Sequence, residues 1–173
     1  MHARSWTGVI LLGLTLAILY PGASSALADE GELILAIEPG WALLAHESKN
    51  RHGVGAGASA WYGVSETLWL AAGTGAHYTF LEKGERALYG EALGGVALAL
   101  DVLRTIPFGE AMIGVVANEN AFAPSVRISL GADYLVTKSL SLGVVFRYRP
   151  LQESLGGDGF FTISLRLGCR LDL

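Results

Sequence analysis

Cysteine, proline and charge are all scarce in this chain of 173 residues. The single cysteine, Cys169, excludes an internal disulfide framework and leaves no set of thiolates for a structural metal site. Charged residues make up only 16% of the chain, whereas hydrophobic residues make up 51%. The net charge of −4 provides no basic surface, so no nucleic-acid partner is expected.

Long apolar runs are also missing beyond the first 28 residues. Residues 9–19 form one apolar stretch, which is too short to cross the roughly 30 Å of hydrocarbon in a bilayer. The basic residue Arg4 precedes this stretch, and Ala26 and Ala28 follow it with the spacing that a signal peptidase recognises. We therefore predict a signal peptide over 1–28, cleaved after Ala28, and one mature domain over 29–173.

Apolar residues of the mature chain alternate with polar or small ones. From Phe161 to Leu173 every second residue is apolar, and Ser164, Arg166 and Arg170 are among the residues between them. A period of two is that of a β-strand whose two faces meet different surroundings. Apolarity that is spread over alternating positions indicates a transmembrane β-barrel, in which one strand face meets lipid and the other meets the lumen.

Eight segments show this strand pattern, and most have the length that a tilted membrane strand needs. The connections after the second, fourth and sixth segments are short, whereas the others are mostly longer and more polar, as in barrels with short periplasmic turns. We predict an eight-stranded antiparallel up-and-down transmembrane barrel with both termini on the periplasmic side. The segments are approximately 32–44, 53–64, 67–80, 87–102, 106–117, 123–135, 140–150 and 159–173.

Residue parity assigns each side chain to lipid or to the lumen. In the seventh segment we expect Val144 to face lipid and Arg147 to face the lumen. The fifth segment fits poorly because Glu110 shares the parity of Phe108 and Met112, so a register slip or bulge is predicted there.

In this register the aromatic side chains gather near the two rims of the barrel, where the two membrane–water interfaces favour them. The aromatic residues expected at the outer rim are Trp41, Tyr78, Phe80, Tyr148 and Phe161, and those expected at the inner rim are Tyr62, Phe108 and Tyr134.

Charged residues gather on the predicted lumen face, opposite small residues of the second to fourth segments. Because an eight-stranded barrel is just wide enough inside to be filled by side chains, we expect a salt-bridged plug. A polar, anion-leaning passage lined by the same arginines is the alternative. The predicted lumen charge network consists of Glu38, Glu91, Asp101, Arg127, Asp133, Arg147, Arg149, Arg166 and Arg170.

Residues that carry catalysis or bind metals are few. His46 and His52 bracket the predicted first outer loop, but no further metal ligand accompanies them, so they are interpreted as solvated loop residues. His77, Ser59 and Glu91 are the one trio from which a Ser–His–acid arrangement is conceivable, although any polar lumen permits such a trio. No catalytic residue, metal or cofactor is predicted, and Cys169 is expected to act as a small hydrophobic residue.

Residues 131–143 read Gly-Ala-Asp-Tyr-Leu-Val-Thr-Lys-Ser-Leu-Ser-Leu-Gly, a strand–turn–strand unit common in small outer-membrane proteins. With the terminal strand, this unit resembles the outer-membrane β-barrel superfamily that includes the OmpA transmembrane domain and the OmpX and OmpW types. The resemblance implies a monomer in a Gram-negative outer membrane, in contact with lipid and the lipopolysaccharide leaflet and inserted by the barrel-assembly machinery. The chain departs from the family pattern at Leu173, where Phe is usual, and no peptidoglycan-binding domain is expected after the barrel.

The sequence therefore favours an integral outer-membrane protein with a structural or surface-exposed role, a side-chain-filled polar lumen and no enzymatic activity. Three alternatives stay open: a narrow porin-like channel for small solutes, an enzyme that modifies outer-membrane lipid, and a soluble periplasmic barrel of lipocalin type, in which the two faces would be reversed.

Overall fold

The computed structural model describes residues 31–46, 49–80, 86–100, 104–119, 121–150 and 159–172. The predicted signal peptide over 1–28 lies outside the described residues. In the described part of the chain no helix is long and apolar enough to cross a membrane. The strands are β1 (Glu32–His46), β2 (Lys49–Gly63), β3 (Leu68–Phe80), β4 (Arg86–Ala99), β5 (Thr105–Asn118), β6 (Phe122–Leu135), β7 (Leu140–Pro150) and β8 (Gly159–Asp172).

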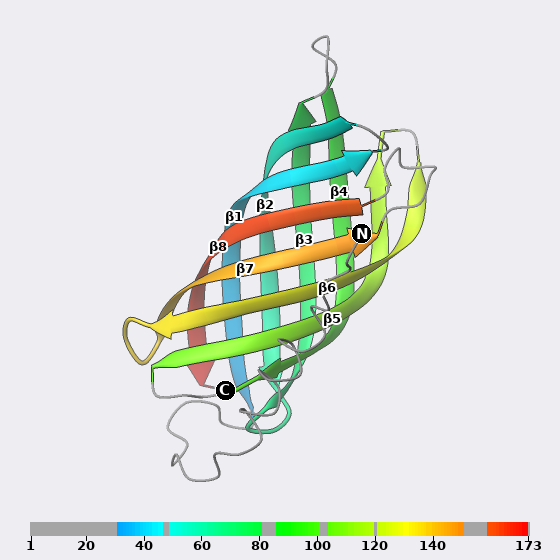
Figure 1. Cartoon of the computed structure of the whole chain (residues 1–173). Coiled ribbons are helices and arrows are strands. Elements are labelled where there is room, and N and C mark those ends of the chain that lie inside the picture. The colour runs from blue at the N-terminus through cyan, green and yellow to red at the C-terminus, as the bar shows by residue number, and fades with distance from the viewer. Residues whose placement is uncertain are drawn as a thin grey trace, which may run out of the picture.

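The eight strands form one closed antiparallel barrel. Each strand pairs with its neighbours in the sequence, and β1 also pairs with β8, so every strand has two partners. Figure 1 shows the strands wrapping obliquely around the barrel, with β1 beside β8. Closure leaves no free sheet edge, which satisfies the requirement that backbone groups in lipid be paired within the protein. The predicted eight-stranded antiparallel barrel is confirmed.

Two of the connections at one end of the barrel are four-residue turns, over 64–67 and 136–139. We call the end where β1 begins and β8 ends the terminal end, and the opposite end the distal end. At the terminal end β2 and β3 are joined by a turn over 64–67, in which the Ser65 hydroxyl accepts a hydrogen bond from the Leu68 amide at 3.1 Å. The turn over 136–139, between β6 and β7, has a matching backbone bond from Val136 to Leu140 at 2.9 Å. In that turn the Thr137 hydroxyl also accepts a hydrogen bond from the Ser139 amide at 3.3 Å, so polar side chains help to fix both tight turns.

The first distal connection is shorter than the sequence predicted. β2 begins at Lys49 and not near residue 53, so only residues 47 and 48 separate it from β1. The interpretation of His46 and His52 as loop residues is therefore wrong: both belong to strands, and the exposed His52 ring lies 5.2 Å from the Trp41 ring. Backbone pairing extends a hairpin whatever the polarity of its side chains, and the polar composition of this stretch concealed that extension.

Strand β5 has no bulge. Its residues pair one to one with β4 from Phe108 to Asn118 and with β6 from Thr105 to Ala117. Phe108, Glu110 and Met112 are all buried on the lumen face. The predicted register slip is wrong because this lumen accepts apolar side chains as well as charged ones.

The outer surface of the barrel is apolar and the lumen is largely polar. Along β7 the buried and exposed residues alternate without interruption from Leu140 to Pro150, with Val144 outside and Arg147 inside. In β8 Leu165 is 56% exposed, whereas the neighbouring Ser164 and Arg166 are buried. Cys169 is exposed on the same apolar face as Leu165. The facing assignments of the last strands are thus confirmed.

Most of the predicted girdle aromatics are on the outer surface, but Phe108 is not. Phe108 is 5% exposed and packs edge-on against Trp61 in the lumen, with ring centroids 4.9 Å apart. Trp61 and Trp69 also lie inside. Among the described residues, the exposed Trp, Tyr and Phe side chains are Trp41, Tyr62, Phe80, Phe122, Tyr134, Phe146, Tyr148 and Phe161, while Tyr78 is half-buried.

Replacing Leu165 with arginine tests the assignment of the outer face. A cation at the middle of the lipid-facing surface costs about 2–4 kcal/mol. We therefore expect Leu165→Arg to lower the free energy of unfolding by that amount in denaturant titrations in lipid vesicles, whereas Leu165→Ile changes it little. Equal unfolding midpoints for the two variants would contradict the assignment.

Candidate functional site

The lumen is built in three layers. At the distal end Ala42, Leu44, Tyr89 and Phe160 form an apolar cluster, the distal cap. At the terminal end a larger apolar cluster, the terminal plug, includes Trp61, Trp69, Phe108, Ile34, Ile106 and Leu135. Charged side chains lie between these two clusters, because Arg149 contacts the ring of Phe160 on one side and Arg166 contacts the ring of Trp61 on the other. We call this middle layer the central network.

One half of the central network is organised around Glu38 on β1. The Ser59 hydroxyl donates a hydrogen bond to Glu38 Oε1 at 3.0 Å. Arg166 Nε donates to the same oxygen at 3.2 Å, and Arg147 Nη2 lies 2.5 Å from Glu38 Oε2. Arg166 also pairs through Nη1 with Asp133 Oδ2. The carboxylates of Glu38 and Asp133 therefore bind the guanidinium groups of Arg147 and Arg166, and all four side chains are buried away from bulk water.

The other half of the central network is organised around Glu91 on β4. Arg127 Nη1 donates to Glu91 Oε1 at 2.7 Å, and its Nη2 donates to Glu110 Oε1 at 3.0 Å. Arg149 pairs with the second oxygen of Glu91. His77 Nε2 lies 3.7 Å from Glu91 Oε1. Arg127 thus bridges carboxylates from two strands, which links the neighbouring strands β4, β5 and β6 through their side chains.

Two arginines also lie over aromatic rings. The Arg166 guanidinium carbon is 4.0 Å from the centre of the Trp61 ring and 5.1 Å from that of Phe108. The Arg149 guanidinium carbon is 5.3 Å from the centre of the Phe160 ring. These cation–π contacts join the charged layer to the apolar layer on each side of it.

Glycines in the part of the wall that faces the arginines leave room for the long arginine side chains. A Cβ atom on Gly73 would lie 3.2 Å from Arg127 Nη2, and one on Gly75 would lie 3.1 Å from Glu91 Oε1. Both distances are shorter than ordinary contact, so a larger residue at either position would press on the central network. The glycines of β3 therefore make space for charged groups that come from other strands.

Buried charge in the described part of the lumen is balanced. Five arginines and five carboxylates are buried, and no member of either set is more than 8% exposed. Beyond the residues already described, the set includes Glu32 and Arg170, which pair at 3.2 Å at the terminal end. Because an isolated buried charge is very costly, equal numbers of the two signs are what a closed lumen requires.

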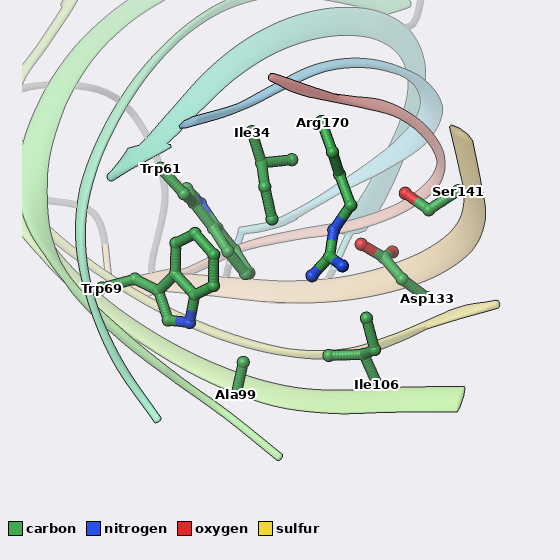
Figure 2. A pocket seen from close by; sticks show the side chains of 8 residues that line it. All are labelled: Ile34, Trp61, Trp69, Ala99, Ile106, Asp133, Ser141 and Arg170. Atoms are coloured by element: carbon green, nitrogen blue, oxygen red, sulfur yellow. The ribbon is translucent and has the colours of Figure 1, made fainter. Parts of the chain in front are cut away.

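A small cavity lies between the terminal plug and Arg170. Its volume is about 10 Å³, room for about one water molecule. Figure 2 shows the Arg170 guanidinium group and the Asp133 carboxylate beside each other on one side of this cavity, and the indole rings of Trp61 and Trp69 on the other. Side chains therefore close this end of the lumen to any larger solute.

The structure places eight of the nine residues of the predicted lumen charge network on the lumen face, each in an ion pair, and Asp101 lies outside the described residues. Glu32 and Glu110 were not predicted as partners in this network. Trp61, Trp69 and Phe160 were not predicted to face the lumen, although Trp61 shares the parity of Ser59. Parity alone was the available signal, and the preference of aromatic residues for the membrane interfaces obscured it.

The trio of His77, Ser59 and Glu91 is divided between the two halves of the network. The Ser59 hydroxyl donates to Glu38, whereas His77 faces Glu91. The three side chains do not form a relay in the order that nucleophilic catalysis needs. Among the described residues no group of three or more His, Cys, Asp or Glu side chains is placed to hold a metal ion.

Comparisons with known proteins agree with this geometry. No family model and no curated protein matches the chain. Among solved structures, Neisserial surface protein A superposes with a TM-score of 0.69 at 14% identity, covering 83% of this chain and 100% of that one. Ail, the attachment invasion locus protein of Yersinia pestis, superposes with a TM-score of 0.61 at 14% identity and the same coverage. The chain has the fold of a small outer-membrane β-barrel.

The fold does not depend on a natural membrane protein sequence. A de novo designed transmembrane β-barrel superposes on this small barrel with a TM-score of 0.53 at 21% identity, covering 84% of this chain and 99% of the design. At these identities the likeness concerns the fold alone.

Replacing Glu38 with glutamine tests the central network. The variant removes the negative charge that Arg147 and Arg166 share, and breaking a buried ion pair in this way costs about 3–5 kcal/mol. We expect Glu38→Gln to lower the free energy of unfolding by that amount in denaturant titrations. The matched variant Glu66→Gln, in the exposed β2–β3 turn, changes it by less than about 0.5 kcal/mol. Equal effects of the two variants would show that Glu38 is not part of a buried network.

Proposed function

We propose that this protein is an integral outer-membrane protein whose closed barrel has a structural or surface-exposed role and does not conduct solutes. The single observation that carries the proposal is the lumen, in which a balanced network of buried ion pairs lies between two apolar clusters. A pore needs a continuous aqueous path, and these three layers of side chains occupy it.

The outer surface supports the membrane part of the proposal. Large apolar side chains are exposed on every strand, and Ile113, Leu130 and Leu165 are each more than half exposed. An apolar surface that surrounds a molecule is stable only when it is covered, and a closed barrel with this surface matches the hydrocarbon region of a bilayer. We infer that the mature protein is a monomer, contacts membrane lipid and lipopolysaccharide, and is inserted by the barrel-assembly machinery with its termini in the periplasm.

A narrow channel for small solutes is the second candidate function. It is favoured by four arginine nitrogen atoms in the central network that are buried without a hydrogen-bond partner: Arg127 Nε, Arg147 Nε, Arg149 Nε and Arg166 Nη2. Such donors could form hydrogen bonds with water or with an anion that passes through the lumen. The balanced charge and the terminal plug favour the closed barrel over this candidate.

Conductance measurements separate the two candidates. In planar lipid bilayers we expect the folded protein to give no persistent openings, because the terminal plug and the central network fill the lumen. Heat-modifiable migration in gels verifies that the reconstituted sample is folded, and a general porin in the same bilayer serves as the positive control. Persistent anion-selective openings of the unmodified protein would contradict the closed barrel and establish the channel.

A further inference from the structure

The lipid-facing surface carries a groove of about 380 Å³ across β1, β8, β7 and β6. Its lining is almost entirely apolar, and its outward-pointing side chains are Trp41, Leu43, Ile128, Leu130, Phe146, Tyr148, Phe161 and Ile163. The volume of the groove falls within the range of small-molecule sites in proteins. We call this feature the crosswise groove.

Strand pairing explains the shape of the crosswise groove. Leu43, Phe161, Tyr148 and Ile128 follow one another as paired residues on adjacent strands, and so form one wall. The other wall is the parallel row of Trp41, Ile163, Phe146 and Leu130. Residues two apart in a strand are about 6.8 Å apart, and four adjacent strands span about 14 Å. The groove therefore lies between two parallel rows of side chains that cross four adjacent strands, and it follows the curvature of the barrel wall.

The spacing of the two rows fits a single hydrocarbon chain. Carbon atoms in contact lie about 3.5–4.0 Å apart, so one line of carbons laid between rows about 6.8 Å apart contacts both walls at once. Aromatic rings stiffen the walls: those of Tyr148 and Phe161 are 4.8 Å apart. Because these rings have few rotatable bonds, ordering them around a chain costs little entropy.

The position of the groove fits a lipid of the leaflet at the distal end. In one wall Tyr148 and Phe161 each lie two residues from the distal end of their strands, whereas Ile128 of the same wall lies six residues from the distal end of β6. A chain in the groove would therefore enter near the distal interface and descend into the apolar surface.

A second groove on the other side of β1 lacks such walls. It is larger, about 540 Å³, but Ala58, Ala60, Ala72 and Ala92 are prominent in its lining. Short side chains leave a shallow surface, so a chain there contacts mainly one side. The contrast assigns selective binding to the crosswise groove.

We propose that the crosswise groove is a binding site for one acyl chain of a lipid in the distal leaflet. The proposal rests on the proposed function, since the chain reaches the groove only from a surrounding bilayer. The groove is continuous with the apolar surface that meets lipid, and its lining offers no charged side chain on the outside. The acyl chain, and not the headgroup, is therefore the recognised part.

Fluorescence quenching by a lipid with a brominated acyl chain tests this site. Trp41 lines the groove, while Trp61 and Trp69 are buried in the lumen at 2% and 1% exposure, so contact quenching by the chain reports on Trp41. The folded mature protein, which lacks Trp6 of the predicted signal peptide, is titrated in detergent micelles with a brominated-chain lysophosphatidylcholine. We expect quenching to reach its midpoint at a mole fraction several-fold below that of a control reporter, Val96→Trp combined with Trp41→Phe. Val96 is exposed on β4, away from the groove.

Filling the groove provides the second arm of the test. Ile128→Phe and Leu130→Phe should shift the midpoint for Trp41 several-fold toward that of the control reporter, while heat-modifiable migration verifies folding. Coincident midpoints for Trp41 and the control reporter in the unfilled protein would overturn the site but leave the proposed function standing. If neither reporter is quenched when the protein is mixed with vesicles of brominated phosphatidylcholine, the barrel does not enter the bilayer and both proposals fail.

Discussion

The pairing of buried arginines with buried carboxylates is the interaction that constrains this barrel most. With the outer surface apolar, the charged side chains of the strands point inward, and the lumen is too narrow to hydrate them. Among the residues that the structure describes, five arginines and five carboxylates therefore pair with one another at exposures of 8% or less. Glu38, Glu91, Arg127 and Arg166 each pair with two groups of opposite charge, which is why the central network forms a unit and not a set of independent pairs.

Strands on opposite sides of the lumen contribute different residues to that network. The buried arginines come from β6, β7 and β8, and glycines of β2 and β3 stand opposite them. Long side chains thus cross the lumen and end at positions such as Gly73, where no side chain is present. Apolar clusters at both ends then exclude bulk water, which strengthens the ion pairs that they enclose.

Much of this arrangement was predictable because a period of two leaves few choices. Once Leu165 faces lipid, Arg166 faces the lumen, and the same parity holds along each strand. Prediction failed where side-chain chemistry and parity disagreed. Phe108 was expected outside because aromatic residues favour interfaces, yet it packs inside on Trp61. His52 was expected in a loop because its neighbours are polar, yet backbone pairing carries β2 past it. Which arginine pairs with which carboxylate depends on closure of the barrel, and no local pattern encodes it.

Coupling between Arg127 and Glu91 tests the central claim most directly, because their side chains meet at 2.7 Å in the middle of the lumen. The measurement is a double-mutant cycle of unfolding free energies in lipid vesicles, with Arg127→Met, Glu91→Gln and the combined variant. A network of buried ion pairs predicts a coupling energy of about 1.5 kcal/mol or more. Effects that add to within about 0.5 kcal/mol would mean that the two charges are separately hydrated, and would contradict the closed, charge-neutral lumen.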